Sequence, residues 1–176
     1  KGVSPFIKQT FDNNTINGEP WSKYAAGYMW GVTGIIYNPE YVTKEEASTW
    51  KIINNDKFRR MITVKDNVRD TMFAAIGAIK SDKLRSQDFT KQADYTDKLA
   101  EVMNDTSKDT ADEVLEYLQQ VKDNVYSFET DSGKIDAITG KISAGYQWSG
   151  DAVYIMQQAE ANDVELNFAI PEECTN

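Results

Sequence analysis

Runs of apolar residues divide the chain into segments of two kinds. The longest run, residues 24–38, is rich in β-branched and aromatic residues and ends at Asn38-Pro39, so it predicts a long strand. Similar but shorter runs predict strands at residues 60–64, 124–128, 141–147 and 164–170. Helical spacing or helix-start residues predict helices at residues 43–49, 66–79, 88–103, 108–121, 132–139 and 152–161. This alternation of strands with helices indicates one α/β domain with a mostly parallel sheet.

Specific residues mark several of the predicted helix starts. Ser4-Pro5 predicts a short helix with proline at its first position. Thr43 followed by Glu46 matches a capping box, and Thr110 is the expected cap of the segment 108–121. We expect the apolar faces of the helices predicted at 66–79 and 108–121 to be buried. They consist of Val68, Met72, Phe73, Ala75, Ile76 and Ile79, and of Ala111, Val114, Leu115, Leu118 and Val121.

Composition and charge narrow the class of partner. The 176 residues are 40% hydrophobic and 27% charged, which is enough for one domain with a proper core. The net charge of −9 disfavours nucleic acid and anionic membrane as main partners. It is compatible with a cationic ligand.

The chain lacks the residues on which most enzyme sites depend. It has no histidine, so the usual general base and every Ser-His or Cys-His pair are excluded. The single cysteine, Cys174, allows neither an intrachain disulfide nor a cysteine-based zinc site. No EF-hand, P-loop or dinucleotide-binding pattern occurs, so we predict no cofactor, no metal site and no catalysis. An acid-dependent hydrolase stays the alternative, because paired carboxylates can cleave glycosides and acid clusters can hold Mg²⁺ or Ca²⁺.

Acidic residues follow three of the predicted strands, each near the start of a helix. These residues are Asp66, Asp70, Asp131 and Asp151. The carboxyl ends of parallel strands meet at the same edge of a sheet, so we expect the acids to gather there. Trp148 belongs to the same edge, with Tyr28 or Trp30 as further aromatic candidates.

The turn that contains Trp148 and Asp151 has two interpretations. An aromatic face and a carboxylate three residues apart suit an organic cation, which both groups attract. Alternatively, Ser149 or Asp151 caps the next helix, Trp148 is core, and each acid complements only its own helix dipole, by ~0.3–1 kcal/mol. The turn by itself favours the second interpretation, whereas the coincidence of acids at three turns favours the first.

Five segments carry longer motifs. Residues 28–38, Tyr-Met-Trp-Gly-Val-Thr-Gly-Ile-Ile-Tyr-Asn, are similar to PY-x-WGTTGI-x-YN, and residues 146–152, Tyr-Gln-Trp-Ser-Gly-Asp-Ala, are similar to GWSGDA. The other three segments match further motifs. Trp50 with residues 58–61 is similar to W…Y-x-G-K-I, residues 66–70 (Asp-Asn-Val-Arg-Asp) are similar to DDPRE, and residues 170–173 (Ile-Pro-Glu-Glu) are similar to IPEEG. In order and spacing, these segments resemble the polyamine-binding proteins of ABC transporters along nearly the whole chain.

The resemblance implies a fold. Proteins of that family have two α/β lobes that close on a ligand, in the type II periplasmic-binding-protein arrangement. We therefore expect residues 1–176 to form a single three-layer lobe, with a mostly parallel sheet flanked by helices. The matched segments belong to the second, inner lobe, so the first lobe is expected in another part of a longer protein.

The resemblance also implies a function. The family delivers spermidine or putrescine to an ABC permease and is not enzymatic, which places this protein outside the cell or in the periplasm, membrane-associated through the parent protein. Matched residue by residue, the implied ligand-binding residues are Trp148, Asp151, Asp70, Asp131, Thr130 and Trp30. Trp148 would stack on the polyamine, Asp151 and Asp70 would pair with its amino groups, and the turn at 130–131 would add a polar contact. Trp30 marks the segment in which the chain crosses between the lobes.

The sequence departs from the family pattern at Gly27, Val32, Asp70 and Cys174. Aspartate in place of glutamate at position 70 shortens the side chain by one methylene, roughly 1.5 Å. The identity of the polyamine therefore stays open. The alternatives are another small solute on the same fold, such as an amino acid, a metal or an organic anion, and a purely structural module. An anion would need basic groups at the turns, where the sequence shows acids.

Overall fold

The computed structural model describes residues 3–27 and 29–175. The chain divides into two compact units, Lys1–Gly31 and Val32–Asn176.

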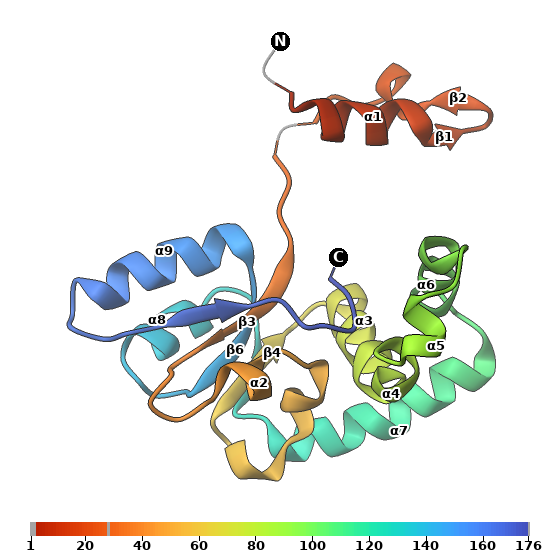
Figure 1. Ribbon diagram of the computed structural model, residues 1–176. Coiled ribbons are helices and arrows are strands. Elements are labelled where there is room, and N and C mark those ends of the chain that lie inside the picture. Colours follow the sequence, from red (N-terminus) through yellow and green to blue (C-terminus); the bar gives the residue numbers. More distant parts are fainter. Residues whose placement is uncertain (1–2, 28, 176) are drawn as a thin grey trace. The chain divides into compact units, whose positions relative to one another are not determined.

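The first unit pairs a helix with a small hairpin (Figure 1). Helix α1 (Pro5–Asn13) begins after Ser4, whose side chain accepts a hydrogen bond from the Ile7 N–H, so the predicted helix start is confirmed. Strands β1 (Thr15–Ile16) and β2 (Glu19–Pro20) are antiparallel and precede a 3₁₀ turn, η1 (Trp21–Lys23). The rings of Phe11 and Trp21 meet edge to face, with centroids 6.0 Å apart.

The second unit is built on a five-stranded sheet of order β5-β4-β6-β3-β7 (Figure 1). Its strands are β3 (Thr33–Tyr37), β4 (Ile62–Lys65), β5 (Ser127–Glu129), β6 (Ala144–Trp148) and β7 (Asn167–Ala169). Strand β4 is parallel to β5 and β6, whereas β3 is antiparallel to both of its neighbours, β6 and β7. Four strands therefore run in one direction and β3 is reversed, so the sheet is mixed: β5, β4 and β6 form the predicted parallel part, and β3 adds two antiparallel pairings.

The predicted strand at residues 24–38 is much too long. Among the described residues of this range, only Thr33–Tyr37 is strand, because these residues find ladder partners in β6 and β7. The residues before Val32 belong to the first unit or to its connection. An apolar, β-branched run thus indicated a strand, but only the available partners set its length.

One face of the sheet is covered by α2 (Lys44–Ala47), the 3₁₀ turns η2 (Trp50–Asn54) and η3 (Asp56–Phe58), α3 (Val68–Ile79) and α7 (Lys108–Asn124). The predicted Thr43–Glu46 capping box is present at the start of α2. Trp50 is fully buried in this layer, and its ring meets Phe73 and Tyr146 edge to face. Trp50 is therefore a core residue of the second unit.

Helices α8 (Gly133–Ile138) and α9 (Ser149–Glu160) cover the opposite face. Ala137 of α8 and Ala152 and Ile155 of α9 form a buried apolar cluster with Ile36 of β3. The sheet thus lies between two helical layers, as the fold prediction requires.

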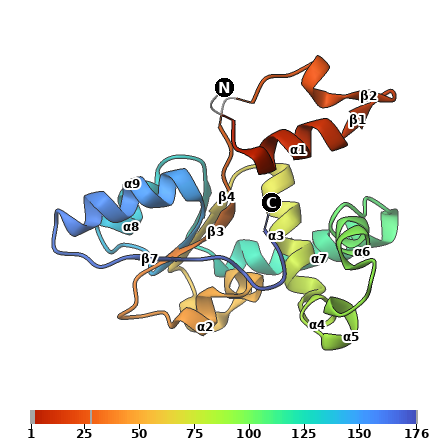
Figure 2. The ribbon, with the colours of Figure 1, turned by 45° about the horizontal axis from the view of Figure 1, so that its top comes forward.

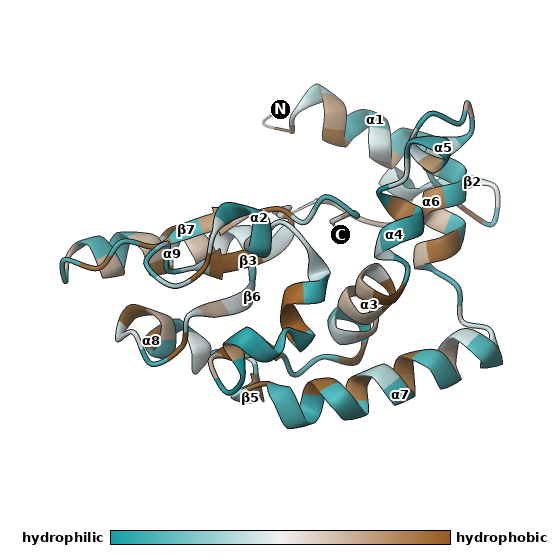
Figure 3. Cartoon of the chain, turned by 60° about the horizontal axis from the view of Figure 1, so that its bottom comes forward, coloured by the Kyte–Doolittle hydropathy of each residue, from teal (hydrophilic) through white to brown (hydrophobic). Residues whose placement is uncertain are grey.

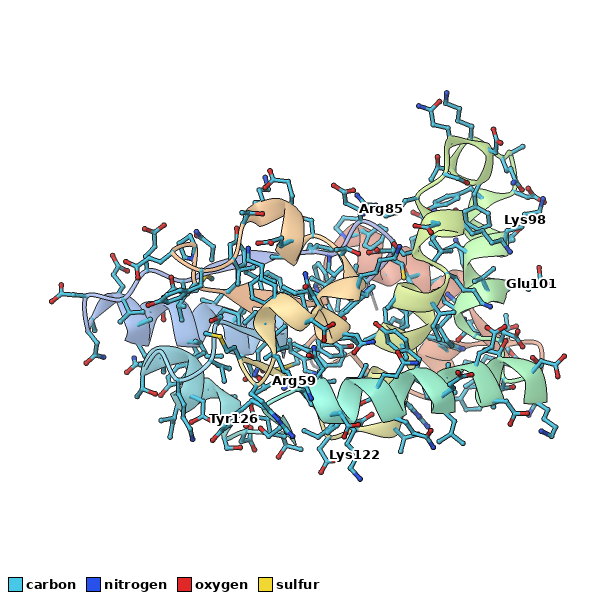
Figure 4. The ribbon with its side chains drawn as sticks, turned by 90° about the horizontal axis from the view of Figure 1, so that it is seen from below. Arg59, Arg85, Lys98, Glu101, Lys122 and Tyr126 are labelled. Atoms are coloured by element: carbon cyan, nitrogen blue, oxygen red, sulfur yellow. The ribbon has the colours of Figure 1, made fainter. Side chains whose placement is uncertain are left out.

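Three short helices form a separate cluster with α3 and α7. They are α4 (Ser81–Leu84), α5 (Gln87–Thr90) and α6 (Tyr95–Met103). Figure 2 shows them grouped away from the sheet, and in Figure 4 Lys98 and Glu101 extend from α6. The continuous helix predicted at 88–103 is wrong: the chain turns between Thr90 and Tyr95 so that Phe89 and Met103 reach one apolar cluster.

Helix α7 differs from its prediction at both ends. Ser107, not Thr110, caps it, because the Thr110 hydroxyl donates instead to Asp105 Oδ2 at 2.6 Å. At the other end, Asn124 is the last helical residue and not the start of β5. Hydrophilic and hydrophobic bands alternate along α7 in Figure 3, and its Lys122 points away from the sheet in Figure 4.

Three residues of the predicted apolar faces are exposed. Val68 is 77% exposed at the first position of α3, and Leu115 is 59% exposed on α7. Ala111 also lies on the solvent side. The rest of each stripe packs inward, so periodicity identified the faces but overstated their width.

A buried carboxylate fixes the C-terminal segment. Glu173 is fully buried and accepts hydrogen bonds from the Ser81 hydroxyl, at 2.6 Å, and from the Trp50 N–H, at 3.3 Å. The Trp50 Nε1–H donates to the carbonyl of Cys174 at 2.9 Å. Burial raises the pKa of the Cys174 thiol to about 12, so this cysteine stays protonated at neutral pH.

Candidate functional site

The carboxyl ends of β4, β5 and β6 bring three turns to one edge of the sheet. The parallel register pairs Lys65 with Glu129 at the ends of β4 and β5, and Thr63 with Gly145 on the β6 side. The acids singled out by the sequence lie just beyond these strands: Asp131 precedes α8, and Asp70 and Asp151 belong to the first turns of α3 and α9. The expected juxtaposition is therefore present, and a ligand role for these residues stays a prediction.

Two of the predicted acids hold a lysine between them. Lys134, the second residue of α8, places its Nζ 2.8 Å from Asp151 Oδ1 and 3.1 Å from Asp131 Oδ1. The Asp131 side chain is 84% exposed, whereas those of Asp151 and Lys134 are 34% and 22% exposed. The hydrogen bond to Asp151 raises the pKa of the Lys134 ammonium, with a smaller contribution from Asp131. The edge thus binds a charged alkylammonium in the structure.

A second lysine lies deeper at the same edge. Lys65 is buried, and its Nζ donates to Gln147 Oε1 at 2.8 Å and to the Thr130 carbonyl at 3.3 Å. Burial lowers the pKa of the Lys65 ammonium, although the charges of Asp151, Asp70 and Asp131 act in the opposite direction.

Asp70 approaches the edge from α3. Asn67 caps that helix by accepting hydrogen bonds from the N–H groups of Arg69 and Asp70. The Asp70 side chain is largely buried, and no ion pair is formed by its carboxylate among the residues that the structure describes. Its charge is therefore available to a cation that reaches the edge.

The turn from β6 into α9 corrects the capping interpretation. Trp148 is the residue at the helix cap, and no side chain makes a capping hydrogen bond there. The Ser149 hydroxyl instead accepts a hydrogen bond from the Val32 N–H at 3.2 Å, and the backbone N–H of Ser149 donates to the Val32 carbonyl at 2.7 Å. Asp151 pairs with Lys134, so neither side chain acts as a cap. Trp148 is half-buried at the end of β6, opposite Thr33.

The remaining predicted residues have different placements. Thr130 is exposed and contributes its carbonyl to Lys65. Trp30 is 67% exposed and belongs to the first unit, so it is not among the residues that the second unit gathers at this edge. Tyr28, the other aromatic candidate, lies outside the described residues.

A buried carboxylate lies beside the Lys134 turn. Glu129 is buried, and its Oε2 accepts from the Ser132 hydroxyl at 2.6 Å. Its Oε1 is buried without a hydrogen-bond partner among the described residues. Gly133, the first residue of α8, makes room for this side chain, because a Cβ there would lie 1.7 Å from Glu129 Oε1.

Gly133→Ala is therefore expected to destabilise the fold by about 1–3 kcal/mol, since the added methyl must displace a buried carboxylate. Gly150→Ala is the matched control, because a Cβ at this helical glycine meets nothing within 4 Å. That change is expected to be neutral or to stabilise by up to about 1 kcal/mol. Urea unfolding of the two variants tests this, and equal free energies of unfolding would contradict the proposed contact.

Sequence analysis missed the basic half of this edge. Lys65 was not singled out from the sequence, although a lysine at the end of a buried strand must find polar partners. Lys134 lies three residues after Asp131, a spacing that brings opposite charges together at a helix start. The description of the turns as acidic without basic groups was therefore incomplete.

Within the described parts of the chain, no three His, Cys, Asp or Glu side chains are grouped closely enough to hold a metal ion.

Comparison with protein families identifies the chain. Residues 3–175 match the model of a family described as bacterial extracellular solute-binding protein. The chain belongs to this family. Its members are binding proteins, and the two-layered helical covering of a mixed sheet is that of a single lobe of the periplasmic-binding-protein fold. In the described part of this family member, no helix combines the length and apolar character needed to cross a membrane.

Solved structures of similar fold include three proteins connected with polyamines or the same PotD designation. The spermidine/putrescine ABC transporter substrate-binding protein PotD from Streptococcus pneumoniae has a TM-score of 0.71 at 20% identity, over 99% of this chain and 44% of its own. A candidate spermidine/putrescine ABC transporter from Listeria monocytogenes gives 0.68 at 22%, over 92% and 42%. The Tp0655 (TpPotD) lipoprotein of Treponema pallidum gives 0.59 at 16%, over 82% and 38%.

These likenesses establish the fold of this family member. The chain spans less than half the length of each of the three structures. A comparison with curated protein sequences gave no match.

Proposed function

We propose that this chain carries half of the ligand cleft of a solute-binding protein that delivers a polyamine, spermidine or putrescine, to an ABC importer. It would be the second lobe of a longer protein that works outside the cell or in the periplasm, held at the membrane through that parent protein. Its partners would be the first lobe and the permease.

The observation that carries the proposal is the ammonium at the edge. Asp151 and Asp131 hold the Lys134 Nζ at 2.8 and 3.1 Å. A lysine side chain ends in the same primary alkylammonium group as putrescine or spermidine. The carboxylate pair therefore has a geometry that fits one end of a polyamine, with charge-assisted hydrogen bonds.

The charge balance of the edge supports the same ligand class. The carboxylates of Asp70, Asp131, Asp151 and Glu129 outnumber the ammonium groups of Lys65 and Lys134. A polycation would bring the missing positive charge, and Trp148 would offer an aromatic face to its methylenes or ammonium. The sequence motifs and the names of the similar structures point to the same class.

Calorimetric titration of the full-length protein with spermidine and with putrescine tests the proposal. We expect saturable binding of at least one of them, and none of glutamate or succinate, which carry the carboxylates that this edge would repel. Glutamate serves as the sharpest control, because it combines an ammonium with two acidic groups. Binding of glutamate or succinate without binding of a polyamine would favour another solute. Turnover of a glycoside or phosphoester would favour a hydrolase.

A further inference from the structure

We propose that Lys134 is an internal competitor for the polyamine: in the ligand-free lobe its ammonium occupies the carboxylate pair that a ligand amino group takes. Lys134 would thereby lower the affinity for every amine and restrict the site to ligands with several charges. The inference rests on the proposed function, since the competition concerns the same edge.

The contacts of Lys134 describe an occupied cation position. Its Nζ is shared between Asp151 and Asp131, which belong to the turns after β6 and β5. The side chain is only 22% exposed, so the bridge closes much of this position to solvent. A ligand ammonium that reaches Asp151 must therefore replace the lysine.

The two lysines of the edge differ in how firmly they are held. Lys65 is buried and donates to a side-chain amide and a backbone carbonyl. Neither acceptor is charged, so a ligand ammonium would not replace Lys65 by pairing with a carboxylate. Among the described residues, the Lys134 ammonium is held by two carboxylates, and one of these partners, Asp131, is 84% exposed. Ion pairs to such exposed groups contribute little, and a lysine stem has several rotatable bonds with which to withdraw. Lys134 is thus the lysine that a ligand can displace.

Displacement has a consequence for selectivity. When one ammonium replaces another on the same carboxylates, the exchange gains little free energy at that position. A ligand gains affinity only if further amino groups reach other acids, such as Asp70, whose carboxylate has no ion pair in the described structure. A monoamine therefore binds poorly while Lys134 is present.

The test compares four forms of the full-length protein by calorimetry with spermidine, putrescine and butylamine. Lys134→Gln is expected to raise the affinity for each amine by about three- to tenfold. Lys134→Arg keeps the competing cation and is expected to stay within about twofold of the unchanged protein. Lys141→Gln is the matched control, because it removes the same charge just after α8, where Lys141 pairs with Asp136 at 3.1 Å and lies over the ring of Tyr126, a residue labelled in Figure 4.

The outcomes separate this inference from the proposed function. If the unchanged protein binds polyamine and Lys134→Gln leaves its affinity unchanged or lowers it, Lys134 is no competitor and the proposed function stands. An equal gain in Lys141→Gln would mean a general charge effect and would also overturn the inference. If neither the unchanged protein nor Lys134→Gln binds any amine, both this inference and the proposed function fail. Lys134→Met provides a second neutral variant if the glutamine variant does not fold.

Discussion

Asp151→Asn in the full-length protein is expected to weaken spermidine binding about 30-fold, or about 2 kcal/mol. The Asp151 carboxylate is the less exposed half of the pair that holds an ammonium at the edge, at 2.8 Å from Lys134 Nζ. An asparagine can accept a hydrogen bond but brings no charge, so a ligand ammonium on it would lack its counter-charge. The same change weakens the hold on Lys134, which offsets part of the loss and keeps the expected effect below that of a fully buried pair.

Two aspartates give graded controls for this prediction. Asp131→Asn should cost less than Asp151→Asn, because the Asp131 side chain is 84% exposed and its ion pair is screened by water and salt. Asp136→Asn should leave binding unchanged, since Asp136 pairs with Lys141. Calorimetric titration at one fixed salt concentration gives the three affinities. Equal affinity for the Asp151 variant and the unchanged protein would remove Asp151 from the binding site.

Trp50→Ala is expected to destabilise the second unit by about 3–5 kcal/mol, the range for truncating a large buried aromatic side chain. Trp50 is fully buried, and its ring centroid lies 6.0 Å from that of Phe73 and 4.7 Å from that of Tyr146. Its Nε1–H also donates to the Cys174 carbonyl, which ties the C-terminal segment to this core. The substitution therefore removes a large apolar volume and leaves the partly buried Cys174 carbonyl without its donor.

Trp21→Ala is the matched control for the stability measurement. Trp21 is 38% exposed in the first unit and meets one ring, that of Phe11. We expect its replacement to cost about 1 kcal/mol or less. Urea unfolding, followed by the circular dichroism of the helices, measures both variants. A loss for Trp50→Ala no larger than that for Trp21→Ala would contradict the central position of Trp50 in the core.

Residue patterns alone predicted the five strands of the sheet and most of the longer helices in their order, but neither the β1–β2 hairpin nor the break between α5 and α6. Helix caps at Ser4 and Thr43 were readable because capping depends on residues only three apart. The parallel pairing of β4 with β5 and β6 was predictable because strands alternate with helices, and parallel neighbours need such crossovers, whereas the two antiparallel pairings of β3 were not predicted. That order also places Asp70, Asp131 and Asp151 at one edge, since each follows a strand of the same direction.

Only the folded chain shows how long each element is and which charged side chains meet at the edge of the sheet. The apolar run at 24–38 became strand only over Thr33–Tyr37, because hydrogen-bond partners in β6 and β7 exist only there. Helical spacing could not predict that Val68 and Leu115 are exposed, because the exposure of a residue depends on which neighbour covers that part of the helix. Lys134 and Lys65 are separated by 69 positions in sequence, so only the folded sheet brings both of them to the acids. A pattern of acids along the chain therefore predicted a cation site, and the fold alone revealed that a lysine of the chain occupies it.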